Sequence, residues 1–184
     1  EASIAMYLVN DEEGMLTLVP EEETGIFRSS DMYVVIYTCK NGSLHVVYTW
    51  EGEDVLLTTR TLAGLRVQTL DVDLGIKGAM HQIYVVQGGE PPLMVSMFSA
   101  RQIPFVVARG IPKSGFMREK STERPKLGVE DREAGRFHLF QVHGHNPHTT
   151  RVVEQSRASV AHLTFYPRDC YIILHKPEEH EDET

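Results

Sequence analysis

Residues 25–42 read GIFRSSDMYVVIYTCKNG, and this stretch decides the fold. The run at 32–39 consists almost entirely of β-branched and aromatic residues, which is typical of a central strand buried on both faces. Asn41-Gly42 follows this run and favours the positive φ angles of a tight turn. The next run, SLHVVYTW at 43–50, is the natural partner strand. The stretch therefore predicts a hairpin at the centre of a sheet.

On either side of this hairpin, shorter apolar segments predict further strands. They lie at 3–9, 15–19, 80–87 and 103–108. Between the last two, PPLMVSMFSA at 91–100 predicts a short helix, because the first turn of a helix tolerates proline.

The segment from Glu53 to about Leu74 changes to a helical period. Its apolar residues recur at spacings of three, four and seven, which places them on one helix face: Leu56, Ala63, Val67, Leu70 and Leu74. Glu53 and Asp54 suit the positive end of a helix dipole, and Gly75 and Gly78 mark the end. The middle of the segment is rich in threonine, so tertiary packing must hold this helix.

Charge is distributed unevenly along the 184 residues, whose formal net charge is −8. Residues 1–100 are strongly acidic, whereas 101–136 hold more basic than acidic residues, and 109–136 have few apolar ones. This segment reads either as a solvated linker or as a contact for an acidic surface or lipid headgroup, and not as an extended nucleic-acid site. Its basic strip comprises Arg109, Lys113, Arg118, Lys120, Arg124 and Lys126.

Strand signals then start again at 137–144, 149–156 and 169–174. Three strands alone are a poor basis for an independent core. They are therefore either part of a truncated domain or strands that lean on the first unit. The expected organisation is a first domain at 1–117, a linker at 118–136, and a partial second domain with an acidic tail at 137–184.

Other chemistry has little support in the sequence. His143, His145 and His148 could hold zinc or copper, although a hairpin loop is the simpler account. Cys39 and Cys170 are interpreted as buried thiols, with a disulfide left open. No nucleophile with a matching base and no phosphate-binding glycine loop is found, so we expect no enzyme. No apolar run is long enough to span a membrane, and the N-terminal residues lack the pattern of a signal peptide.

Taken in order, these pieces resemble a gelsolin-like repeat of the gelsolin/villin superfamily. The resemblance is carried by Gly25-Ile26-Phe27, Asp31-Met32-Tyr33, Trp50-Glu51-Gly52, Leu70-Asp71-Val72-Asp73-Leu74, Val86-Gln87-Gly88-Gly89-Glu90 and Phe98. The later strands resemble the opening of a next repeat, through Leu139-Phe140-Gln141-Val142, Thr150-Arg151-Val152-Val153-Glu154 and Asp169-Cys170-Tyr171-Ile172-Ile173-Leu174.

The resemblance implies an α+β fold with a mixed β-sheet between one long and one short helix, plus the first strands of a second repeat. It also implies a cytoplasmic, cytoskeletal module that binds actin within a filament capping, severing or bundling regulator. Phosphoinositide headgroups are a second expected partner, through the basic strip. The alternative is a scaffold module, as in supervillin-like or flightless-like proteins, that keeps the fold and binds another protein. The predicted partner contacts on the long helix are Glu53, Arg60, Arg66, Val67 and Asp71.

The resemblance also raises calcium binding. The family site takes an aspartate at a strand start, a glutamate from the long helix and nearby backbone carbonyls. Here Asp31 and the carbonyl of Ser30 match, with Pro112 near a further carbonyl, but the helix glutamate falls at Thr59. Because Ca²⁺ needs several oxygens with carboxylate charge, we expect the site to be weak or absent. Asp31 could instead cap a turn, and Asp169 is its match in the second repeat.

Overall fold

The structure is a computed structural model that describes residues 2–10, 13–39, 42–76, 79–111, 137–146, 148–155, 165 and 167–175. The expected linker at 118–136 and the acidic tail lie outside these residues. So does the basic strip, apart from Arg109.

The first sheet has the order β2-β1-β4-β5-β6. Its strands are β1 (Ser3–Val9), β2 (Leu16–Leu18), β4 (Met32–Thr38), β5 (Leu44–Glu51) and β6 (Ala79–Val86). The predicted hairpin is confirmed, because β4 and β5 are antiparallel and Gly42 has a φ of 66°. β5 and β6 are parallel, so the chain must cross over between them, and helices occupy that connection.

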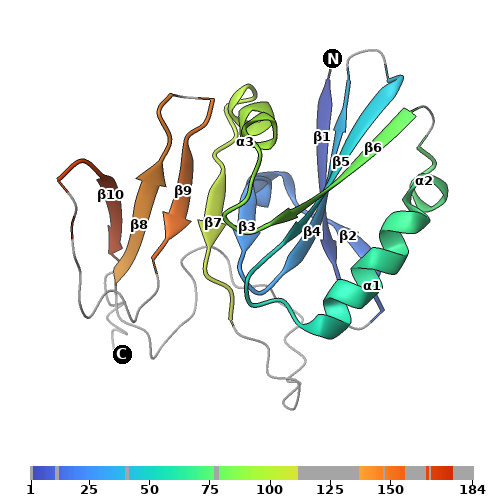
Figure 1. Ribbon diagram of the computed structural model, residues 1–184, viewed down its shortest axis with the longest axis horizontal. Coiled ribbons are helices and arrows are strands. Elements are labelled where there is room, and N and C mark those ends of the chain that lie inside the picture. Colours follow the sequence, from blue (N-terminus) through green and yellow to red (C-terminus); the bar gives the residue numbers. More distant parts are fainter. Residues whose placement is uncertain are drawn as a thin grey trace, which may run out of the picture.

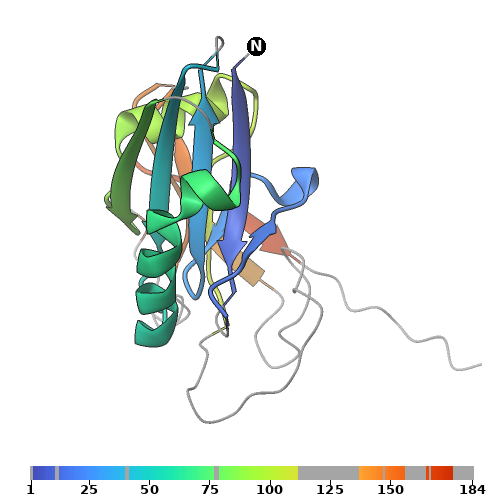
Figure 2. The same ribbon diagram turned by 90° about the vertical axis from the view of Figure 1, so that its right-hand side faces the viewer.

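Helices cover both faces of this sheet (Figures 1 and 2). α1 (Leu57–Gln68) and α2 (Leu70–Asp73) lie on one face, and α3 (Pro92–Ser99) belongs to the core on the other. Successive residues of β4 divide between the two cores, since side chains in a strand alternate. Tyr33 and Val35 join the α3 core, whereas Val34 joins the α1 core. The predicted mixed sheet between a long and a short helix is confirmed.

An aromatic cluster fills the core on the α3 side. The ring of Phe27 lies 5.0 Å from that of Trp50, 5.4 Å from Tyr33 and 4.7 Å from Phe105, measured between centroids. All four residues are at most 3% exposed. Edge-to-face and stacked pairs of this kind add to the stabilisation that burial alone gives.

A second sheet has the order β10-β8-β9-β7-β3, and Figure 1 shows these strands side by side. They are β3 (Ile26–Arg28), β7 (Val106–Ala108), β8 (Phe137–His143), β9 (Arg151–Glu154) and β10 (Cys170–His175). β7 pairs in parallel with both β3 and β9. The later strands therefore pair with the first unit, through the contact of β9 with β7. Among themselves, β9-β8-β10 repeat the arrangement β2-β1-β4.

The single long helix predicted at 53–74 is wrong at its start and in its middle. Glu53 and Asp54 form a turn, because the backbone N–H of Asp54 bonds to the carbonyl of Ser29 at 2.9 Å. The helix begins at Leu57 instead and breaks at Thr69, whose hydroxyl bonds to the carbonyl of Arg66. A threonine hydroxyl competes with the helical backbone in this way.

Three smaller differences separate the structure from the sequence prediction. β3 was not predicted, because its parallel partner β7 lies far along the chain. The strand predicted from 103 begins at Val106, since the N–H of Ile103 still bonds to Phe98 at the end of α3. Both cysteines are free, and Cys170 is exposed on the edge strand β10, so its predicted burial is wrong. Within the described residues, no helix is both long and apolar enough to traverse a bilayer.

Candidate functional site

The outer side of α1 and α2 is exposed, and the described side chains at its centre are uncharged. The inner side is held by Thr59, Ala63 and Leu70, all fully buried. On the opposite side, Leu57 is 70% exposed and Leu65 is 60% exposed. We call this outer surface the helix face: Leu57, Thr58, Thr61, Gly64, Leu65, Gln68, Thr69 and Val72. Exposed apolar side chains gathered on one surface mark interaction sites.

Four of the five predicted partner contacts border the helix face or lie beneath it. Glu53 is exposed in the turn before α1, and Arg60 is exposed and forms an ion pair with Glu51. Arg66 is half-buried, and Val67 is half-buried against the core. The fifth, Asp71, lies in α2, and its side chain is outside the described part.

Sequence reasoning missed the apolar residues of the helix face. Leu57 and Leu65 are eight residues apart, which brings them to the same side of a helix with 100° per residue. Thr59 and Ala63 then fall on the opposite side. The spacing of Leu57 and Leu65 thus predicts a second apolar row on the side of the helix that faces away from the core.

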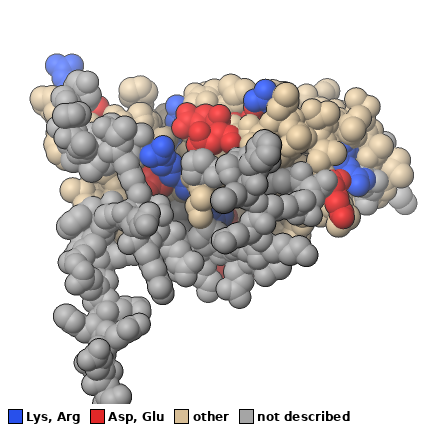
Figure 3. Space-filling model, turned by 90° about the horizontal axis from the view of Figure 1, so that it is seen from below, with Lys and Arg blue, Asp and Glu red and all other residues tan. Residues whose placement is uncertain are grey.

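Charged side chains of the described residues are scattered over the side of the molecule seen from below (Figure 3). On that side they stand in separate small groups, with no extended basic surface among them.

The candidate calcium position is occupied by internal hydrogen bonds. Asp31 is 7% exposed, and its carboxylate accepts from the Ser30 hydroxyl at 3.2 Å and from the Tyr33 hydroxyl at 3.1 Å. The backbone carbonyl of Asp31 accepts the N–H of Gly52 at 3.1 Å. Asp31 thus ties the start of β4 to the turn that follows β5.

These residues do not fit a calcium ion. Ca²⁺ takes six to eight oxygens, several of them from carboxylates, whereas Thr59 is a fully buried neutral residue. No group of three or more His, Cys, Asp or Glu side chains in the described part could hold a metal ion. His143, His145 and His148 form no such group, so the described residues give the zinc or copper interpretation no support. Pro112 lies outside the described residues.

The second repeat reproduces the hydrogen bond between tyrosine and aspartate. The Tyr171 hydroxyl donates to Asp169 at 3.3 Å, just as the Tyr33 hydroxyl donates to Asp31. Asp169 is exposed and also accepts from the side-chain amide of Gln141 at 2.8 Å. The predicted match of the two aspartates is thus reflected in their local contacts.

Ser29 organises the turn that leads into α1. Its hydroxyl donates to the carboxylate of Asp54 at 2.7 Å and accepts the N–H of Gly110 at 3.0 Å. Gly52 is required here, because a Cβ at this position would lie 2.1 Å from the carbonyl oxygen of Ser29. The close approach joins the ends of β3, β5 and β7, and so fixes where α1 begins.

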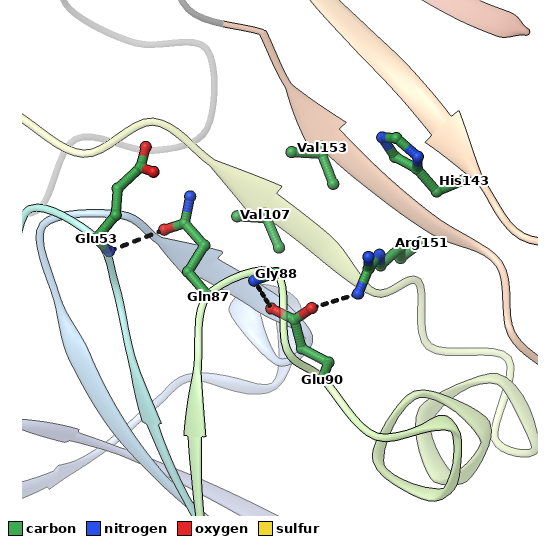
Figure 4. Close-up of a pocket in the computed structure, with 8 residues that line it drawn as sticks. All are labelled: Glu53, Gln87, Gly88, Glu90, Val107, His143, Arg151 and Val153. Atoms are coloured by element: carbon green, nitrogen blue, oxygen red, sulfur yellow. Dashed lines mark hydrogen bonds and ion pairs between the residues drawn. The ribbon is translucent and has the colours of Figure 1, made fainter.

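A pocket of about 220 Å³ lies where β8 and β9 meet this region (Figure 4). In the figure the side chain of Arg151 points toward Glu90. The apolar side chains of Val107 and Val153 lie between Gln87 and His143. The lining residues are Glu53, Gln87, Gly88, Glu90, Val107, His143, Arg151 and Val153.

Comparison with known proteins finds gelsolins and an advillin, whereas no family model matches. The chain is 32% identical over 131 residues to a cytoplasmic gelsolin of Halocynthia roretzi, covering 71% of this chain and 18% of the relative. It is 31% identical over 138 residues to the gelsolin of Xenopus laevis, covering 74% and 29%. It is 30% identical over 148 residues to the advillin of Mus musculus, covering 78% and 16%.

The chain thus spans less than a third of the length of each of these relatives. A solved complex of Thorarchaeota 2DGel3 with rabbit actin aligns over 92% of this chain and 71% of that chain, at 17% identity. Its TM-score of 0.42 is too low to support an inference. The identities to gelsolins and advillin, together with the mixed sheet between two helices, agree with the motifs around Asp31, Trp50 and Glu90. The chain therefore belongs to the gelsolin/villin superfamily.

Proposed function

We propose that this chain binds actin through the helix face, without catalysis, as a module of a cytoplasmic regulator that caps, severs or bundles filaments. Membership of the gelsolin/villin superfamily supports actin as the partner. The observation that carries the proposal is the exposure of Leu57, Leu65 and Val72, at 70%, 60% and 79%, on the helix face, whose described residues are uncharged.

The physical argument is that of a helix entering a groove. An amphipathic helix binds a groove through apolar anchors spaced along one side. Fully burying a leucine contributes about 1.5–3 kcal/mol, so Leu57 and Leu65 together can supply a substantial part of a micromolar affinity. Arg60, paired with Glu51, stands at the border, where charges act on orientation and association rate.

We further propose that this contact does not depend on calcium. The support is chemical, because Asp31 faces hydroxyl donors and Thr59 brings no charge. Binding measured in calcium and in a chelator should therefore agree. A tenfold or larger difference would contradict this part of the proposal.

The helix face is tested with Leu65→Asp and a matched control, Leu93→Asp. Leu93 is 64% exposed on α3, so both substitutions place a carboxylate at an exposed leucine of a helix. Leu65→Asp should weaken pelleting with filamentous actin, and its effect on fluorescent actin assembly, at least tenfold. Leu93→Asp should leave both unchanged.

Two results would overturn the assignment. If Leu65→Asp and Leu93→Asp bind equally well, the helix face is not the contact. If the unmodified chain neither pellets with filaments nor alters assembly, actin is not the partner, and the scaffold alternative takes its place.

Phosphoinositide binding stays a prediction, since five of the six cations of the basic strip lie outside the described residues. Vesicles with and without phosphatidylinositol bisphosphate test it directly. Polybasic segments gain about 1 kcal/mol per cation near an anionic surface, so binding should fall steeply with added salt.

A further inference from the structure

Strand β9 is attached to the first repeat by backbone as well as side-chain bonds. The N–H of Val152 donates to the carbonyl of Phe105 at 2.9 Å, where β9 pairs with β7. The carboxylate of Glu154 accepts the backbone N–H of Arg109 at 2.7 Å and contacts His138 at 2.7 Å. Both bonds to the first repeat therefore come from β9, and His138 of β8 contacts Glu154 within the hairpin.

At this junction Glu90 and Arg151 form an ion pair (Figure 4). The side chain of Glu90 is only 1% exposed, and that of Arg151 is 25% exposed. Glu90 also accepts the indole N–H of Trp50 and the backbone N–H of Gly88, both at 2.9 Å. Removing the cation from a carboxylate that is this buried is strongly unfavourable.

The loop that carries Glu90 also holds the start of α1. The side-chain oxygen of Gln87 accepts the backbone N–H of Glu53 at 3.2 Å, and the N–H of Gln87 donates to Glu51 at 2.8 Å. Glu53 belongs to the turn that precedes Leu57, the first residue of α1. One short loop therefore contacts β9 on one side and the approach to the helix face on the other.

We infer that the Glu90–Arg151 pair fastens the second repeat to the first and positions the turn from which the helix face starts, so that docking of β9 strengthens partner binding. The last clause rests on the proposed function. Arg151 acts here as a positioning residue, because it lies on β9 and reaches the turn only through the loop 87–90.

The experiment compares Arg151→Met, Glu90→Gln and the double variant in the full chain. Met removes the cation and keeps much of the side-chain length. Gln keeps an oxygen that can accept from Trp50 and Gly88. Arg101→Met is the control, because Arg101 is half-buried and forms no ion pair within the described residues.

Stability is measured by denaturant unfolding, followed through the single tryptophan, Trp50. Arg151→Met should lower the folding equilibrium constant on the order of a hundredfold, because it leaves an unpaired buried carboxylate. In the double variant with Glu90→Gln, the folding equilibrium constant should be at least tenfold higher than in Arg151→Met alone. Arg101→Met should stay close to the unmodified chain. If the double variant is no more stable than Arg151→Met, the stabilising role of the Glu90–Arg151 pair is contradicted.

Positioning is measured by amide hydrogen exchange, which needs no partner. In Arg151→Met, the amides of Val152 and Glu53 should exchange at least tenfold faster, with recovery in the double variant. If the amide of Glu53 exchanges at the same rate in Arg151→Met as in the unmodified chain, Arg151 does not position the turn before α1.

Actin affinity then tests the last clause. It should fall at least threefold in Arg151→Met and recover in the double variant, and an unchanged affinity overturns the clause. If the unmodified chain binds no actin, the proposed function and this clause fail together. The exchange and unfolding data still decide whether Glu90 and Arg151 join the repeats.

Discussion

Replacing Gly52 with alanine should damage the turn on which both the fold and the helix face depend. A Cβ at Gly52 would lie 2.1 Å from the carbonyl oxygen of Ser29 and 2.9 Å from that of Arg28. Heavy atoms are most favourably placed at about 3.5–4.0 Å, so the two segments would have to separate by more than about 1 Å. Backbone atoms cannot yield as the end of a flexible side chain can.

The expected cost follows from the contacts that such a shift breaks. The bond from Gly52 N–H to Asp31 and the bond from Asp54 N–H to Ser29, at 3.1 and 2.9 Å, would both be lost. Each contributes about 1 kcal/mol. Overpacking strain adds about 1–3 kcal/mol. We therefore expect Gly52→Ala to lower the free energy of unfolding by about 3–5 kcal/mol.

Urea unfolding measures this change, and Gly64→Ala is its control. Gly64 lies in α1, and a Cβ there would meet no atom within 4 Å. Because alanine favours a helix over glycine, Gly64→Ala should raise the free energy of unfolding by about 0.8–1 kcal/mol. The two substitutions are chemically identical and should have opposite signs. A loss of under 1 kcal/mol in Gly52→Ala would refute the close-approach argument.

Three further predictions test the buried residues. Thr59→Glu should be less stable than Thr59→Gln without metal. Calcium at a hundred times its dissociation constant should stabilise the glutamate variant alone, by about 2.7 kcal/mol. If calorimetry finds no calcium binding to Thr59→Glu, Thr59 does not stand at the position of a calcium ligand beside Asp31. Burial raises the pKa of Tyr48, so the folded state keeps a proton that the unfolded chain releases. Unfolding free energy should therefore fall as pH rises beyond about 10, less steeply in Tyr48→Phe, and equal slopes in both chains would contradict this. Met94→Ala should cost about 2–5 kcal/mol in denaturant unfolding, since Met94 is fully buried, and a cost under 1 kcal/mol would place Met94 outside the tightly packed core.

The strands could be predicted from the sequence because alternation is a local property. The segments predicted at 3–9 and 32–39 differ from β1 and β4 by at most one residue. The start of the long helix could not be predicted in this way. Glu53 and Asp54 have the charges of a first helical turn, but Asp54 is held by Ser29, 25 residues earlier in the chain. A tertiary contact therefore overrode the local signal.

The candidate site was predictable only in part, for a related reason. Thr59 could be identified by its spacing from Trp50, because family motifs preserve spacing. Leu65 was not singled out, because an apolar residue on a helix is first assigned to the core. The pair Glu90–Arg151 could not be found at all, since it joins residues whose proximity depends on the parallel pairing of β7 with β9.

The parallel pairing of β3 with β7 also sets an order of events during synthesis. β1, β2, β4 and β5 can associate once residue 51 has left the ribosome, but β3 must wait for β7. β7 ends 57 residues after Glu51, so at about 5–20 residues per second the wait lasts roughly 3–11 s. During this time the nascent chain cannot complete the aromatic cluster around Phe27, because Phe98 and Phe105 have not yet been made. The segment around Phe27 is thus where a nascent-chain chaperone would be needed first.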